Sequence, residues 1–195
     1  MPALRLDTAT TCLLLIDVQE RLIGEMERAE RLVDRCCFLV AMAGVLGLPI
    51  AVTEQYAKGL GHTVEPVRRA LPPGTPVFEK TRFSGCVAPV MEWLGDHGRP
   101  NVLIGGIEAH VCILQSGLDL LASGKNVFPV FDAISGGEPD QITPALRRLE
   151  RAGAIVTGCV SATYELMRDA AHPRFRECLS LVKALRAAPD GKKAL

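Results

Sequence analysis

Short apolar runs alternate along this chain with segments of helical periodicity, and this alternation constrains the fold more than any other feature. The runs are nearly continuous in Leu, Ile and Val, as expected for strands that are buried on both faces. We expect strands at Thr11–Ile16, Pro49–Thr53, Pro76–Glu79, Asn101–Gly105, Asn126–Phe131 and Ala154–Thr157. The repeated strand-then-helix order predicts an α/β fold with three layers (αβα), in which an open, six-stranded, mostly parallel sheet carries helices on both faces.

Helix signals fill the segments between the expected strands. The longest such segment runs from Ala29 to Leu46 and has one apolar stripe. That stripe comprises Leu32, Cys36, Leu39, Val40 and Ala43. Thr143-Pro144 resembles an N-cap followed by proline at the first helical position, whereas Gly153 and Gly124 fit positions just beyond a helix end.

Length and charge limit the classes of function. The 195 residues suit one domain that spans 1–195, with a small, polar tail from about residue 187 that we expect to fray. Lys plus Arg (22) equals Asp plus Glu (22), so no basic excess favours nucleic acid or an anionic membrane. Zero net charge with positive mean hydropathy favours buried subunit interfaces, and hence a homo-oligomer.

The cysteines and the N-terminal segment predict a cytoplasmic protein. Seven cysteines are scattered without a CxxC pair, which is typical of free thiols in a reducing compartment. The first residues lack the basic start and long apolar core of a signal peptide. No apolar run reaches the ~20 residues that a membrane helix needs.

Cys112 stands where a reactive thiol would be expected. It follows the fourth expected strand and a short turn, and the apolar residues after it recur at helical spacing. We therefore expect Cys112 at or next to the first turn of a helix. Free N–H groups and the helix dipole favour a thiolate there, so the sequence predicts a nucleophile at neutral pH.

Two other strand ends carry charged residues that could join Cys112. Asp17 ends the first strand and Lys80 ends the third. Because the carboxyl ends of parallel strands share one edge of the sheet, the three side chains could converge on one crevice. A thiol, a carboxylate and an ammonium together suit acyl transfer.

Each of these residues also has an ordinary structural interpretation. Asp17 could form a turn, Lys80 could be a solvated lysine, and Cys112 could be a small core residue. The other cysteines are assigned to structure, with Cys86 left open because it follows Lys80 closely. The functional interpretation depends on the combination of the three strand ends.

Other kinds of site have weaker support. The four histidines show no HExxH or paired-ligand spacing, so we expect no metal site. No GxGxxG opens a helix after the first strand and no P-loop occurs, so we expect no cofactor. We expect Gln19, Tyr56, Phe83 and His110 to line a pocket for a small-molecule substrate, although His110 could instead form a hydrogen bond within its turn.

These segments resemble the isochorismatase-like cysteine hydrolases. The matching stretches are Leu13–Gln19, Thr53–Tyr56, Glu79–Ser84, Gly105–Cys112 and Phe131–Ala133. The resemblance implies a six-stranded parallel α/β fold and a catalytic triad of Asp17, Lys80 and Cys112. It also implies a cis peptide at Ile107–Glu108, an oxyanion hole made by the backbone N–H groups of Glu108 and Cys112, and association of subunits.

The sequence departs from the family pattern at two places, and the first departure disfavours a metal-dependent nicotinamidase. Nicotinamidases of this superfamily carry a histidine-and-aspartate metal motif after the second strand, and Glu54–His62 lacks it. Many amidases of the family have Thr-Asp where this chain has Ala109-His110. The pattern is similar to the isochorismatase domain-containing branch.

Three functions remain open at this point. The first is a metal-independent cysteine hydrolase that cleaves a C–N bond of a small amide or ureido compound through a thioester. The second is an isochorismate-type hydrolase that cleaves a vinyl ether without a covalent intermediate. The third is a non-enzymatic, oligomeric binding protein that has kept the pocket.

Overall fold

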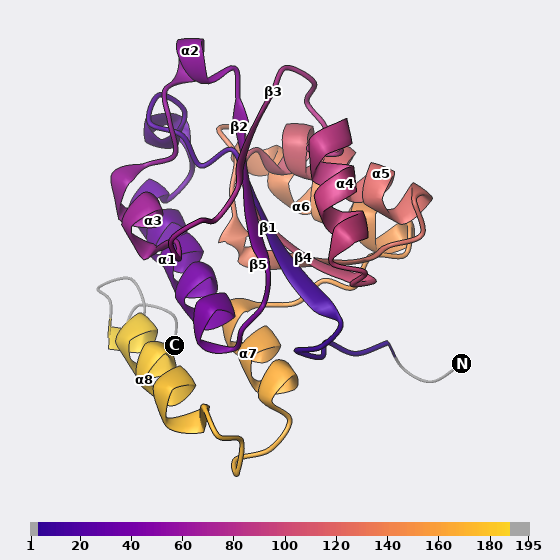
Figure 1. The fold of residues 1–195 in the computed structure, drawn as a ribbon. Coiled ribbons are helices and arrows are strands. Elements are labelled where there is room, and N and C mark those ends of the chain that lie inside the picture. Colours follow the sequence, from indigo (N-terminus) through magenta and orange to yellow (C-terminus); the bar gives the residue numbers. More distant parts are fainter. Residues whose placement is uncertain (1–3, 188–195) are drawn as a thin grey trace.

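A single parallel sheet forms the centre of the molecule (Figure 1). The structure is a computed structural model that describes residues 4–187. Its five strands lie in the order β3-β2-β1-β4-β5. They are β1 (Thr11–Ile16), β2 (Ile50–Gln55), β3 (Val77–Lys80), β4 (Asn101–Gly106) and β5 (Asn126–Ile134).

Helices cover both faces of this sheet, which confirms the three-layer α/β architecture. Figure 1 shows α4, α5 and α6 on one side, with α1, α3, α7 and α8 on the other. The helices are α1 (Ala29–Val45), α2 (Ala57–Leu60), α3 (Glu65–Ala70), α4 (Ala88–Asp96), α5 (Leu114–Ala122), α6 (Pro139–Arg151), α7 (Cys159–Met167) and α8 (Phe175–Ala187). A 3₁₀ turn, η1 (Ile23–Glu25), and a π-helical turn, η2 (Ala109–Ile113), complete the regular structure.

The central strand β1 is buried along its whole length, and its side chains alternate between two cores. Leu13 and Leu15 join the cluster that includes α1, α7 and α8. Cys12, Leu14 and Ile16 join the cluster under α4, α5 and α6. Burial on both faces explains why the strand is a continuous apolar run. The first polar residue after it, Asp17, lies at the carboxyl end of the strand.

The expected sixth strand, Ala154–Thr157, is wrong. This segment runs beside β5, where the N–H groups of Ile155 and Thr157 donate to the carbonyls of Val127 and Pro129, both at 2.9 Å. Only one isolated bridge, Val130 to Thr157, results. Pro129 has no N–H to donate back, so the ladder of backbone hydrogen bonds is interrupted at that residue.

One predicted helix start is also wrong, although the predicted helix ends are correct. Helix α6 begins at Pro139, so Thr143-Pro144 lies inside it. The proline preferred in the first helical turn is Pro139, five residues before Pro144. Pro144 has no N–H to donate to the carbonyl of Asp140, which is an exposed residue. Gly124 and Gly153 follow their helices with φ of 83° and 108°, as expected.

Two further expectations concern the ends of the chain and membranes. Ala187 closes α8, and the remainder of the expected tail lies outside the described residues. Within residues 4–187, no helix combines the length and apolarity needed to cross a membrane.

A substitution at Gly106 tests how closely β4 approaches β1. Gly106 has φ of 113°, and a Cβ there would lie 2.0 Å from the carbonyl oxygen of Ile16. We expect Gly106→Ala to lower the free energy of unfolding, measured by urea denaturation, by about 3 kcal/mol or more. Gly124→Ala is the matched control, because its positive φ is similar but no atom lies within 4 Å. We expect the control to cost only about 1 kcal/mol, and equal costs in the two variants would contradict the close approach.

Candidate active site

Asp17 and Lys80 form a buried ion pair at the carboxyl edge of the sheet. The Lys80 Nζ lies 2.6 Å from Asp17 Oδ2, and the two side chains are 0% and 1% exposed. Lys80 is the last residue of β3 and Asp17 directly follows β1, so the pair reaches across the end of β2. The topology therefore brings together two of the three residues predicted to converge.

Residues of β2 hold both partners of this pair in place. The Thr53 hydroxyl donates to Asp17 Oδ1 at 2.7 Å, so each carboxylate oxygen accepts a hydrogen bond. The Asp17 N–H donates to the Thr53 carbonyl, and its backbone is left-handed with φ of 55°. The Gln55 Oε1 accepts from Lys80 Nζ at 2.6 Å.

Lys80 also fixes the loop that follows β3. Its ammonium is within hydrogen-bond range of the carbonyl oxygens of Arg82 and Phe83, at 3.2 and 3.1 Å. An ammonium has three N–H groups, and Asp17, Gln55 and these carbonyls engage all of them. Lys80 is therefore suited to orient Asp17, and it has no donor left for a ligand.

Cys112 lies in the turn η2, which runs directly into α5, and its side chain faces the ion pair. Burial first, and then the negative charge of Asp17, raise the pKa of the Cys112 thiol to about 12. The Lys80 charge lowers this pKa, a hydrogen bond with Asp17 raises it, and a hydrogen bond from the Glu108 N–H lowers it. The Asp17 carboxylate and the Glu108 N–H are thus both close enough to the thiol to shift its pKa.

The expectation of a thiolate at neutral pH is thus wrong for the protein without a substrate. The helix start does follow Cys112, but the residue is only 7% exposed. Desolvation of a buried thiolate outweighs the favourable dipole and the Lys80 charge. The thiol is therefore protonated and stands next to an acceptor for its proton.

The turn before Cys112 is anchored by the segment after β5. The Ile107–Glu108 peptide bond is cis. The Ala109 N–H donates to the Ser135 carbonyl at 2.8 Å, and the Gly137 N–H donates to Glu108 Oε2 at 3.0 Å. These bonds hold the Ala109 main chain and the Glu108 side chain, and so they anchor the turn that contains the Glu108 N–H.

Ser116 links the Cys112 turn to the loop that follows β3, and sequence reasoning missed it. Its hydroxyl donates to the Cys112 carbonyl at 2.5 Å and accepts from the Gly85 N–H at 2.6 Å. Ser116 is fully buried. A serine one turn after Cys112 was the available signal, but its partner at Gly85 could be found only in three dimensions. Thr53 and Gln55 were missed for the same reason.

The four residues expected to line a substrate pocket have different environments. Gln19 is fully buried, and its amide bonds only to main chain: the carbonyls of Gln55 and Gly61 and the N–H of Gln55. It therefore holds the segment after β2. Tyr56 and Phe83 are 51% and 55% exposed. His110 is half-buried, and its Nδ1 is buried without a hydrogen-bond partner among the described atoms.

A cluster of polar side chains around Glu54 lies near the site. Glu54 accepts from the N–H and hydroxyl of Thr63, at 2.6 and 2.8 Å, and lies 2.9 Å from His62 Nδ1.

Across residues 4–187, no three side chains of His, Cys, Asp or Glu gather as a metal site would require. All seven cysteines are free, and the Cys86 thiol lies 3.5 Å from the Ser116 carbonyl.

Comparison with known proteins places this arrangement in a family. The sequence model of the isochorismatase domain matches residues 11–160, which include all three convergent side chains. The chain belongs to the isochorismatase family. This result agrees with the resemblance carried by the strand-end motifs.

Relatives match over nearly the whole chain. Isochorismatase family protein 1B of Dictyostelium discoideum is 34% identical over 181 residues, which cover 91% of this chain and 88% of that protein. The secreted isochorismatase effector Isc1 of Phytophthora sojae is 36% identical over 183 residues, covering 92% and 87%. The structure of MAR1 ribonuclease from Caenorhabditis elegans superposes with a TM-score of 0.91 at 36% identity and covers 98% of both chains.

Removal of the Asp17 charge tests the cause of the raised thiol pKa. We expect Asp17→Asn to lower the pKa of Cys112, because a negative charge is lost while the Lys80 charge remains. Iodoacetamide would then alkylate Cys112 faster at about pH 9, as followed by peptide mass spectrometry. Cys86, whose pKa of about 11 does not depend on Asp17, is the internal control. An unchanged or slower rate at Cys112 would contradict the assigned cause.

Removal of the ammonium tests the ion pair itself. We expect Lys80→Met to lower the free energy of unfolding by about 3–5 kcal/mol, because Asp17 would be left as an uncompensated buried charge. Addition of Asp17→Asn to this variant should recover part of the loss in urea denaturation. Strictly additive losses would show that the two groups do not interact.

Proposed function

We propose that this isochorismatase-family hydrolase is a metal-independent cysteine hydrolase that cleaves the C–N bond of a small amide or ureido substrate. The observation that carries the proposal is that the Cys112 thiol lies close to both the Asp17 carboxylate and the Glu108 N–H. One neighbour can accept the thiol proton, and the other can donate to an oxygen. Acyl transfer needs both of these groups around its nucleophile.

As the attack proceeds, the thiol proton moves to Asp17. The sulfur forms a bond to the carbonyl carbon of the substrate, and the π electrons move onto the carbonyl oxygen. The backbone N–H groups of Glu108 and Cys112 are proposed to stabilise that negative oxygen. The raised pKa of the thiol supports a proton transfer that accompanies the attack, since a free thiolate is disfavoured in this environment.

The thioester then forms and is hydrolysed. As the oxyanion collapses, the C–N bond breaks, and the leaving amine takes the proton held by Asp17. Water next gives a proton to Asp17 and adds its oxygen to the thioester carbon. The C–S bond breaks, Cys112 takes the proton back, and the carboxylic acid leaves. Lys80 keeps Asp17 oriented throughout and transfers no proton.

Tyr56, Phe83 and His110 are proposed to contact the substrate. Tyr56 and Phe83 flank the ends of β2 and β3, which carry the residues that hold Asp17. Their exposed aromatic side chains could cover an apolar part of a small molecule.

We also expect the protein to form a homo-oligomer and to act in the cytoplasm. The exposed apolar side chains of Tyr56, Val77 and Phe83 support an interface between subunits.

RNA is the second candidate substrate, because the Caenorhabditis elegans relative is described as a ribonuclease. The formal net charge of zero favours the small-molecule proposal, since binding to a polyanion depends on neutralising many phosphates. Both candidates can be assayed with the same protein.

A covalent-adduct experiment tests the proposal. The full chain is incubated with a panel of small amides and ureido compounds, then quenched with acid and mapped by mass spectrometry. We expect an acyl group on Cys112 and release of amine, with turnover reduced about a thousandfold or more in Cys112→Ala. Cys86→Ser is the matched control, because Cys86 is half-buried nearby and should leave turnover within about twofold.

Other outcomes favour the alternatives. Turnover of a vinyl ether that persists in Cys112→Ala, without an adduct, would indicate the non-covalent isochorismate-type reaction. Cleavage of a labelled RNA that persists in the same variant would indicate a ribonuclease that does not use Cys112. Absence of turnover with every substrate, together with a tightly bound protein partner, would indicate a binding protein.

A further inference from the structure

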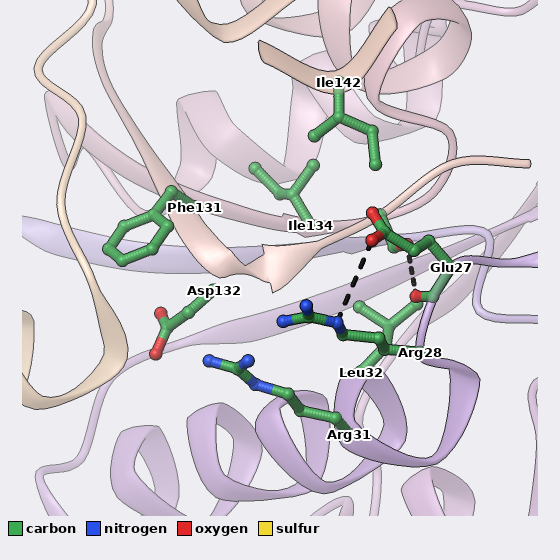
Figure 2. A pocket seen from close by; sticks show the side chains of 9 residues that line it. Glu27, Arg28, Arg31, Leu32, Phe131, Asp132, Ile134 and Ile142 are labelled. Carbon is green, nitrogen blue, oxygen red and sulfur yellow. Dashed lines mark hydrogen bonds and ion pairs between the residues drawn. The ribbon is translucent and has the colours of Figure 1, made fainter. Parts of the chain in front are cut away.

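A hollow lies beside the sheet, and neither Asp17 nor Lys80 lines it. It has a volume of about 180 Å³ and is enclosed by the start of α1, the end of β5 and helix α6 (Figure 2). Its lining consists of Glu27, Arg28, Arg31, Leu32, Phe131, Asp132, Ile134, Ser135 and Ile142. This volume corresponds to about six water molecules in the liquid, so the hollow suits a small molecule only.

Two arginines in this hollow have charges that are available to a ligand. Arg31 is half-buried and forms no ion pair with any residue between 4 and 187. Arg28 approaches Glu27 only to 3.8 Å, and both of these side chains are well exposed. An exposed ion pair at that distance contributes little to stability, so the Arg28 guanidinium is able to pair with another anion instead. In Figure 2 the Arg28 guanidinium lies near the middle of the residues drawn, and that of Arg31 points toward Asp132.

The carboxylate of Asp132 is already neutralised by other groups. Its Oδ2 lies 3.2 Å from Arg35, and its Oδ1 accepts the N–H of Cys159 at 2.8 Å. Both side chains of this pair are largely buried. With Asp132 compensated by Arg35, and Glu27 facing Arg28, the charge of Arg31 is in excess in the hollow.

Apolar side chains provide the remaining contact surface. Leu32 and Ile134 are buried and Ile142 is half-buried, while the ring of Phe131 is 53% exposed. Figure 2 shows Phe131, Ile134 and Ile142 on the side of the hollow opposite α1 and its arginines. A cationic wall facing an apolar wall matches a molecule with one anionic end and one apolar end.

We propose that this hollow binds a small organic carboxylate. Its carboxylate contacts Arg31 and Arg28, and its apolar body lies against Phe131, Ile134 and Ile142. Guanidinium groups suit this role because their N–H fork matches a carboxylate.

This site is separate from the proposed catalytic centre, yet the two share one wall. Asp17, Lys80 and Cys112 do not line the hollow. Ser135 does line it, and the Ser135 carbonyl accepts the Ala109 N–H of the oxyanion turn. The proposal therefore does not depend on the amide chemistry at Cys112, and binding can be measured without turnover.

Benzoate is a suitable probe, with benzamide and acetate as its partners. Benzamide keeps the apolar ring without the charge, and acetate keeps the charge without the ring. We titrate each into the isotope-labelled full chain and follow backbone amide shifts by NMR. We expect benzoate to bind at least tenfold more tightly than either partner, with shifts centred on Arg31 and on Phe131–Ser135.

Variants at Arg31, Arg147 and Cys112 locate the binding site. Arg31→Gln should weaken benzoate binding by about tenfold or more, because a charged hydrogen bond is lost. Arg147→Gln, at an exposed position of α6 that does not line the hollow, should leave it unchanged. Cys112→Ala should bind benzoate as tightly as the unchanged protein does, because Cys112 does not line the hollow. Shifts centred on Cys112, equal binding of benzamide, no effect of Arg31→Gln, or no binding of benzoate would each overturn the proposal.

Discussion

The buried ion pair between Asp17 and Lys80 is the interaction on which the rest of the site depends. Two charges that leave water incur a large desolvation penalty, and only close geometry with further hydrogen bonds offsets it. Here Thr53 and Gln55 supply those bonds from β2, and the carbonyls of the loop after β3 complete the environment of the ammonium. Strand order thus determines whether this pair can exist, because β2 lies between its two sources.

The same pair influences the protonation of the Cys112 thiol. Burial and the Asp17 charge favour a protonated Cys112, whereas Lys80 and the Glu108 N–H favour the thiolate. Burial and the Asp17 charge outweigh the other two influences, so the pKa of the thiol is raised. A buried thiol of this kind resists alkylation and oxidation better than a thiolate would, since the thiolate is the reactive form.

The turn that carries the Glu108 N–H is supported from the far side by the segment after β5. Gly106 permits β4 to approach β1 closely, and Ser135 holds Ala109 beyond the cis bond. Ser135 also donates its hydroxyl to the Glu27 carbonyl at 2.8 Å, which joins this segment to the start of α1. The candidate active site and the proposed carboxylate site are therefore connected through Ser135.

The layered α/β fold could be predicted from the sequence alone, because short apolar runs alternate with segments of helical periodicity. Asp17, Lys80 and Cys112 could be located as well, since Asp17 directly follows β1, Lys80 ends β3 and Cys112 lies in the turn after β4. The tertiary structure sets which hydrogen bonds these groups make, because Thr53 and Ser116 act through partners distant along the chain. The tertiary structure also sets the direction in which the pKa of the Cys112 thiol shifts, because burial has a larger effect than position relative to a helix. The expected sixth strand does not form because Pro129 has no N–H to donate to the neighbouring segment. This absence affects strand pairing only when that segment lies beside β5.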